Sequence, residues 1–392
     1  FNLEYHVRHT ALPPPGEIRQ LKRLAGRILS QKLDHHKPLW EMWLVEGLAG
    51  DRFGMVLKAH HAMVDGIGGM DLFASLLRLE PSMDVPPARR WFPRPAPGPA
   101  RLVADELGRR AALPFSALDA ARSALSRPFE SFKEARESVY ALGETIGAGF
   151  SPTTATPLND ELGPYRRFDW TETEISDVRE IRKHLGGTLN DVVLSTVAGA
   201  VGRFLRRRGE VLDEETVFRA MVPVSLRKRS ERGQPGNRVV NFLAELAVHE
   251  RDPKRRLEKT SETTRRLKES RLVRGAEVME EIGDRGFTNL LIQFVRLGAN
   301  QLAYNLVVTN VPGPPRPLYL LGSRMDAIYP VVPLFRNQGV GIALFSYNGL
   351  LHWGFNADWD ALPDLHDLVD DVGAELAALR EAADASQVGG SA

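Results

Sequence analysis

The sequence predicts a protein of the α+β class. Two paired strand patterns, at 40–59 and 339–356, lie near opposite ends of the chain, and each pair is separated by turn residues. Helical patterns lie between and beside them, and the most apolar of these begins at Leu189. Strands joined by short turns pair antiparallel, so both halves of the chain are expected to combine antiparallel strands with covering helices.

The composition is that of a globular protein. The chain has 392 residues, of which 43% are hydrophobic and 26% charged, which is enough for a large core and two or three domains. The net charge of +1 gives no reason to expect nucleic acid or another polyanion as a partner. The absence of cysteine excludes disulfides, Cys-based metal sites and an acyl-cysteine intermediate, and it fits a reducing interior.

The N-terminal elements follow from simple patterns. Apolar residues at helical spacing predict a helix over 17–33, and the charged, Pro-containing segment 34–38 after it predicts a surface loop that holds His35 and His36. The runs 40–48 and 52–59 predict two antiparallel strands around an Ala-Gly-Asp turn, and the second strand is expected to be buried. A further helical pattern covers 70–79.

The middle of the chain changes composition. Six prolines after residue 85 predict an extended linker within 81–99. Two helical patterns rich in arginine follow over 102–148. Basic amphipathic helices can lie on an anionic membrane surface, and the alternative is a helical connector that packs over the domains. We expect a domain boundary near the polar segment 151–159.

The C-terminal elements begin with a strand at 166–171 and a helix at 174–184. The long buried helix that follows starts after Thr188, which forms a capping-box pattern with Asp191. Asn348-Gly349 is typical of a type I′ hairpin turn. The remaining patterns predict strands at 217–226, 237–248, 306–311, 324–332, 339–347 and 351–356, a solvated helix at 253–270, a buried helix at 285–301 and a final helix at 365–382.

The segment with the strongest chemical signal is His60-His61-Ala62-Met63-Val64-Asp65-Gly66. It follows the strand at 52–59, and a carboxylate lies four residues after the second histidine. An imidazole oriented by a nearby acidic group can act as a general base for a hydroxyl. On an extended backbone His60 and His61 face opposite ways, so one of them is expected to reach a cleft. Two incidental histidines beside a solvated Asp65 are the alternative, but the doubled histidine and the Gly-rich exit favour a catalytic role.

This segment resembles the H-H-x-x-x-D-G motif of the wax ester synthase/diacylglycerol acyltransferase family. That family is part of the superfamily of chloramphenicol and carnitine acyltransferases and peptide-synthetase condensation domains. Pro38-Leu39-Trp40, Asn190-Asp191 and Asn310-Val311-Pro312-Gly313-Pro314 resemble the family's P-L-W, N-D and N-V-P-G-P motifs, in the same order. Together the four motifs span most of the chain.

The resemblance implies two chloramphenicol-acetyltransferase-like domains, each with a mixed sheet flanked by helices, and an active-site tunnel between them. The expected boundaries are 1–85 for the N-terminal acyltransferase domain and 86–150 for the Pro-rich linker and helical connector. Residues 151–385 would form the C-terminal acyltransferase-like domain, and 386–392 a disordered tail. Residues 1–9 resemble a segment that lies well inside full-length members, so the beginning of the first domain is expected to be missing.

The resemblance also implies an activity. A fatty acyl group would move from acyl-CoA to diacylglycerol or a long-chain alcohol, giving triacylglycerol or a wax ester, with acyl-CoA as co-substrate and no cofactor. Peripheral contact with a membrane or lipid droplet and a cytoplasmic location are expected. His61 would be the general base, and His60, Asp65 and Gly66 would support it.

The other implied site residues come from the three remaining motifs. Asn190 would stabilise an oxyanion or position the substrate, and Asp191 beside it would either contribute there or cap the helix. Asn310 would shape the cleft at the end of its strand. Trp40 would be part of the core or of the cleft wall.

Three alternatives come from other classes of function. His60, His61 and Asp65 could form a two-His-one-carboxylate metal site, although adjacent histidines on one strand diverge. The chain could instead be a condensation-type enzyme that uses carrier-bound acyl groups. It could also be a catalytically idle lipid-binding scaffold, although His61, Asp65 and Gly66 are all present.

Overall fold

The computed structural model describes residues 2–60, 63, 76–85, 87, 92, 97–108, 152–225, 239–269 and 302–389. The chain divides into two compact units. The first unit comprises residues 1–83, 153–265 and 304–392, and the second comprises 84–152 and 266–303. All the sheets described below are in the first unit.

A small sheet contains the strands predicted near the N-terminus. The short helix α1 (Leu3–His6) leads into β1 (Val7–Ala11), which pairs parallel with β2 (Trp40–Leu48). The predicted hairpin of β2 with β3 (Arg52–Ala59) is confirmed. The prediction that β3 is buried was wrong, because its residues are partly or fully exposed. The strand lies at the edge of the described sheet, so one side of it has no neighbouring strand.

The helix α2 (Ile18–Ser30) joins this sheet to the rest of the first unit. A reciprocal capping box between Glu17 and Gln20 starts it, and Lys58 of β3 donates to carbonyls at its C-terminal end. Its Ala25 packs with Phe168 and Trp170, which belong to the large sheet. Since α2 contacts both β3 and β4, it connects the two sheets.

The large sheet is mixed, with the described order β4-β11-β10-β7-β5-β6. Strands β4 and β11, β11 and β10, and β5 and β6 pair antiparallel, whereas β10 and β7, and β7 and β5, pair parallel. The Asn348-Gly349 turn has positive φ at both residues, as a type I′ turn requires. The strand bounds are β4 Arg166–Glu174, β5 Arg219–Ser225, β6 Val239–Glu245, β7 Leu306–Pro312, β10 Val340–Tyr347 and β11 Leu350–Asp358.

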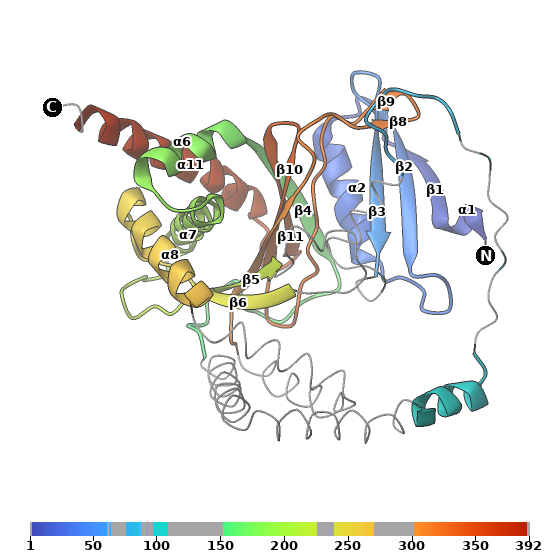
Figure 1. Ribbon diagram of the computed structural model, residues 1–392, viewed down its shortest axis with the longest axis horizontal. Helices are drawn as coiled ribbons and strands as arrows, with labels where there is room; N and C mark the ends of the chain where they lie inside the picture. The colour runs from blue at the N-terminus through green and yellow to red at the C-terminus, as the bar shows by residue number, and fades with distance from the viewer. Residues whose placement is uncertain are drawn as a thin grey trace, which may run out of the picture. The chain divides into compact units, whose positions relative to one another are not determined.

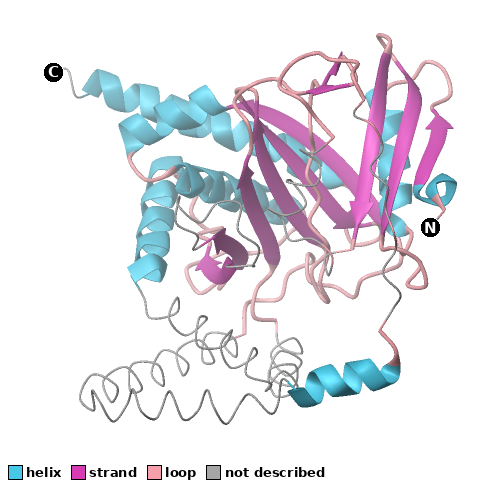
Figure 2. Cartoon of the chain, turned by 45° about the vertical axis from the view of Figure 1, so that its right-hand side comes forward, coloured by secondary structure: helices cyan, strands magenta, loops and turns pink. Residues whose placement is uncertain are grey.

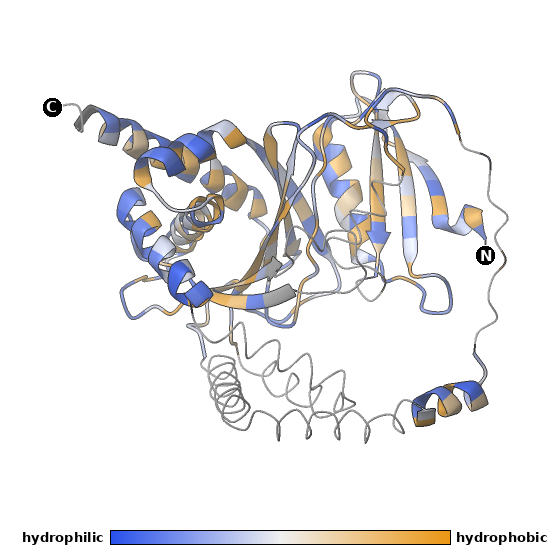
Figure 3. Ribbon diagram, in the orientation of Figure 1, coloured by the Kyte–Doolittle hydropathy of each residue, from blue (hydrophilic) through white to orange (hydrophobic). Residues whose placement is uncertain are grey.

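Four helices of the described residues gather on one side of the large sheet, as Figures 1 and 2 show. They are α6 (Ile175–Leu185), α7 (Leu189–Arg207), α8 (Pro253–Glu269) and α11 (Leu365–Gly389). Helix α7 is buried continuously from residue 191 to 202, as expected for a helix that is apolar on all sides. Figure 3 shows the contrast with α8, which is largely hydrophilic on its visible side. These mixed sheets with flanking helices confirm the predicted fold class.

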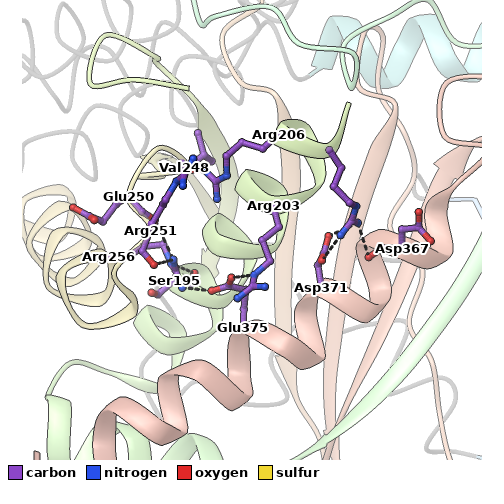
Figure 4. A network of polar contacts seen from close by, with 11 residues as sticks. Ser195, Arg203, Arg206, Val248, Glu250, Arg251, Arg256, Asp367, Asp371 and Glu375 are labelled. Atoms are coloured by element: carbon purple, nitrogen blue, oxygen red, sulfur yellow. Dashed lines mark hydrogen bonds and ion pairs between the residues drawn. The ribbon is translucent and has the colours of Figure 1, made fainter. Parts of the chain in front are cut away.

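A buried ionic network holds α7, α8 and α11 together (Figure 4). Arg256 of α8 is only 1% exposed and pairs with Glu375 of α11. Arg203 of α7 donates to the second oxygen of the same carboxylate. Gly199 of α7 leaves room for the pair, because a Cβ at this position would overlap the Glu375 carboxylate and the Arg256 guanidinium. The prediction that α8 is solvated therefore holds for its outer face but not for Arg256.

Several predicted boundaries were wrong. The helix predicted over 70–79 does not extend to residue 79. The described residues 76–79 are not helical, and Arg78 forms a β-bridge with Tyr319. A helix covers 99–108, so it begins inside the predicted linker. The predicted strand 324–332 shrinks to the two-residue β9 (Ser323–Arg324), paired with β8 (Tyr319–Leu320). Pro330 interrupts the apolar pattern there, and proline has no N–H to donate to a ladder.

At the C-terminus, α11 continues to Gly389, so residues 386–389 of the predicted disordered tail are helical. The predicted helix over 285–301 and most of the pattern over 102–148 lie outside the described residues. The predicted boundary near 151–159 and the tunnel between two domains stay predictions.

Candidate active site

The predicted site residues fall into three sets. His61, Asp65 and Gly66 lie outside the described residues. Trp40 and His60 lie where β2 begins and β3 ends. Asn190 and Asp191 lie where α7 begins, and Asn310 lies near the end of β7. Trp40 and His60 belong to a first group of contacts, and these three residues belong to a second group.

Hydrogen bonds fix the backbone where β3 ends. The His60 N–H donates to the Leu39 carbonyl at 2.9 Å, which extends the β2–β3 pairing by one step. Met63 N–H donates back to the His60 carbonyl, also at 2.9 Å. The partly buried His60 ring meets the ring of His35 edge-on, with centroids 5.5 Å apart. The loop that holds His35 is exposed, as predicted, yet it touches the first histidine of the motif.

Trp40 is held by a residue that the sequence patterns did not single out. His6, which is 1% exposed, stacks on the Trp40 indole with centroids 4.7 Å apart. Its Nδ1 lies 2.7 Å from the Trp40 carbonyl. A carbonyl can only accept, so Nδ1 carries the proton. No local pattern could have identified His6, because the contact depends on the parallel register of β1 beside β2.

The second group brings together two predicted residues that are 120 positions apart. Asn310 of β7 donates through Nδ2 to Oδ1 of Asn190 at 2.9 Å, and both side chains are partly buried. The Nδ2 of Asn190 and the Oδ1 of Asn310 are the groups of this pair that the bond does not use. An amide N–H at the start of a helix can serve a developing negative charge, because free backbone N–H groups lie beside it.

Asp191 is engaged as a helix cap. Its Oδ2 accepts from the backbone N–H of Thr188 at 2.7 Å, and its Oδ1 accepts from Thr264 Oγ1 at 2.6 Å. In the other direction, the Asp191 N–H donates to Thr188 Oγ1 at 3.3 Å. With both oxygens bonded and 3% exposure, these contacts favour the capping role over direct substrate contact.

Sterics require a glycine at position 313 of the N-V-P-G-P segment. A Cβ at Gly313 would overlap the Phe345 ring and the Ser346 carbonyl, so only glycine fits there. Its N–H donates to Ser346 Oγ at 3.0 Å. These contacts fix the chain just after Asn310 against β10.

A further polar cluster lies on the large sheet outside the predicted site. The fully buried His352 of β11 has Nδ1 3.5 Å from Glu172 Oε1, and Tyr329 donates its hydroxyl to the same carboxylate oxygen. Neither ring nitrogen of His352 has a hydrogen-bond partner among the described residues. Burial lowers the pKa of His352, although the nearby Glu172 carboxylate acts in the opposite direction.

No group of three or more His, Cys, Asp or Glu side chains suited to a metal ion occurs among the described residues. The alternative metal site needs His61 and Asp65, which are not among them, so that alternative stays untested.

Comparison with known proteins identifies the family. The model of the wax ester synthase/diacylglycerol acyltransferase catalytic domain matches residues 1–193, and the model of the WS/DGAT C-terminal domain matches residues 235–380. The chain belongs to this family. The predicted family and its acyltransferase class are thereby confirmed.

Individual relatives agree with this assignment. A Mycobacterium tuberculosis protein named as a candidate diacylglycerol O-acyltransferase, Rv1760, is 33% identical over 98% of the chain and 76% of its own length. The O-acyltransferase WSD of Acinetobacter baylyi is 32% identical over 96% of the chain and 81% of its own length. The solved wax ester synthase/diacylglycerol acyltransferase of Marinobacter aquaeolei VT8 superposes with a TM-score of 0.67 at 25% identity, covering 98% of this chain and 81% of that one.

Proposed function

We propose that this protein transfers a fatty acyl group from acyl-CoA to the hydroxyl of diacylglycerol or a long-chain alcohol, giving triacylglycerol or a wax ester. The observation that carries the proposal is the family match over nearly the whole chain, with all four motifs present in order. The Asn190–Asn310 hydrogen bond adds geometric support, because it joins two of these motifs in space.

The proposed chemistry is direct transfer in a ternary complex, since the chain has no cysteine to hold the acyl group. His61 takes the proton of the acceptor hydroxyl, and the acceptor oxygen attacks the thioester carbon. The tetrahedral intermediate then collapses, the C–S bond breaks, and the thiolate of CoA takes the proton from His61. A general base contributes about 10²- to 10⁴-fold to such a reaction.

The remaining residues support this step. Asp65 orients the loop through an arginine, and Gly66 lets the backbone or the substrate come close. His60 packs beside His35 and keeps the strand end in place. The Nδ2 of Asn190 stabilises the oxyanion or positions the substrate, with Asn310 fixing its orientation. Trp40, stacked on His6, supports the end of β3 through the β2–β3 pairing.

The decisive experiment incubates the protein with labelled palmitoyl-CoA and either hexadecanol or dioleoylglycerol, and separates the products by chromatography. His61→Ala should lower kcat at least about 100-fold, while the exposed loop variant His36→Ala, a matched control, should retain activity. Near-normal turnover by His61→Ala would refute the role of His61. Absence of both esters with the unaltered protein would favour carrier-bound acyl groups or an idle scaffold.

We also propose a cytoplasmic protein in peripheral contact with a membrane or lipid droplet. No helix in the described residues is long and apolar enough to cross a bilayer. The helix at 99–108 exposes Leu102, Val103 and Leu107, each by more than half, which supports surface contact with lipid. Flotation with phosphatidylcholine/phosphatidylglycerol vesicles tests this, and replacing the three residues by serine should weaken binding. Unchanged flotation would exclude this helix as the contact.

A further inference from the structure

The first turn of α7, which carries Asn190, is clamped by α8. Thr264 of α8 is 8% exposed, and its Oγ1 lies 2.6 Å from Asp191 Oδ1 and 3.1 Å from the Ser261 carbonyl. A hydroxyl has one proton, and the shorter of these two contacts is the stronger hydrogen bond. The Thr264 proton is therefore on the bond to Asp191.

α8 also comes close to the chain just before this turn. Gly187, which has φ +80°, lies directly before the N-cap, and a Cβ at this position would be 2.7 Å from Ser261 Oγ. Ser261 and Thr264 are one turn apart on α8, so one face of this helix rests on residues 187–191. Through Ser261 and Thr264, α8 therefore lies against the N-terminal end of α7.

The contact between Thr264 and Asp191 lies next to the Asn190–Asn310 pair. Asp191 uses Oδ1 for Thr264 and Oδ2 for the N–H of Thr188, and Asn190 is its immediate neighbour in the first turn. The bond from Asn310 to Asn190 is 2.9 Å long. Groups that act on a transition state must be held within about 0.5 Å, so a small movement of the first turn is enough to misplace the Asn190 amide.

We propose that Thr264 is a positioning residue for acyl transfer, which acts through Asp191 to hold Asn190 against Asn310. The proposal rests on the proposed function of Asn190. It assigns to α8, a charged helix with no predicted site residue, a part in the geometry of the site. Thr264 itself touches neither the donor nor the acceptor.

The test compares Thr264→Val, which keeps the shape and removes the hydroxyl, with Thr264→Ser, which keeps the hydroxyl. Thr264→Val should lower kcat per folded protein about tenfold with KM for palmitoyl-CoA within about twofold, and Thr264→Ser should stay close to the unaltered protein. Thr260→Val is the matched control, because the buried Thr260 hydroxyl donates to the Arg256 carbonyl of its own helix.

A double-mutant cycle separates positioning from stability. In an Asn190→Ala background, Thr264→Val should produce no further loss of kcat, whereas a merely structural role would produce similar effects in both backgrounds. If Asn190→Ala lowers kcat and Thr264→Val does not, the positioning role is overturned and the proposed function stands. If Asn190→Ala leaves kcat unchanged, both the role of Asn190 and that of Thr264 are overturned. Should Thr264→Val fail to fold, Thr264→Ala compared with Thr264→Ser makes the same test.

Discussion

Removing the Glu375 carboxylate should destabilise the protein far more than removing an exposed one. Glu375 accepts from Arg256, which is 1% exposed and also donates to the Ser195 carbonyl at 3.0 Å and the Glu250 carbonyl at 3.0 Å. In Glu375→Ala these carbonyls remain, but the guanidinium charge stays buried without its hydrogen-bonded carboxylate. Breaking a buried pair in this way costs about 3–5 kcal/mol.

The structure supplies a matched control. Asp326 pairs with Arg324 at 3.2 Å, and both side chains are more than half exposed, so Asp326→Ala should cost at most about 1 kcal/mol. The two variants remove the same kind of group from the same kind of partner. They differ in whether water can replace the lost carboxylate.

Urea unfolding followed by far-UV circular dichroism measures both free energies. A third variant, Arg256→Met with Glu375→Leu, removes both charges and should recover most of the loss, because replacing a buried pair by apolar residues is often neutral. A loss below about 1 kcal/mol for Glu375→Ala, or a double variant no more stable than the single one, would refute the reasoning.

Three further predictions concern His352, Gly313 and Lys58. The pKa of His352 is lowered in the folded protein, so the unfolded chain binds a proton first as pH falls below about 6.5, and stability is lost in that direction; His352→Phe should show a flatter stability–pH curve in thermal melts, and equal slopes would contradict this. Gly313→Ala should lower the melting temperature and kcat, because its Cβ overlaps the Ser346 carbonyl; full activity would show that the segment can move. Lys58→Met should lower the free energy of unfolding by about 0.5–2 kcal/mol in urea, since it removes the donor to the last carbonyls of α2. Lys32→Met, at an exposed lysine just after α2, is the control.

The elements that local chemistry specifies could be predicted from the sequence. The β2–β3 hairpin follows from residue alternation around a glycine turn, and the start of α7 from the spacing of Thr188 and Asp191. The run 324–332 was misinterpreted, because Met325 and Ile328 pack on Phe345 and Tyr347 of β10, and Tyr329 packs on β4, without strand pairing. There the Pro330 carbonyl lies so close to Gly354 that no Cβ would fit. Such packing depends on a sheet face formed by distant segments, which no local pattern contains.

For the site, the sequence identified residue types but not their contacts. Motif resemblance singled out Asn190 and Asn310, and only the hydrogen bond between α7 and β7 shows that they meet. His6 and Thr264 were not predicted, because each acts through a partner that is distant in sequence. Arg256 had the appearance of a solvent-facing residue of a charged helix, and its burial depends on Glu375, 119 positions away.

The position of α2 has a consequence for dissecting the chain. Its Ala25 side packs on Phe168 and Trp170, and Gly26 approaches the Arg166 carbonyl so closely that a Cβ would lie 2.9 Å from it. A fragment of residues 1–85 produced alone would expose the apolar face of α2 around Ala25 to water and self-associate. Co-production with a fragment that contains β4 would shield it, so split versions of this protein should be recovered as a reassembled pair rather than as independent pieces.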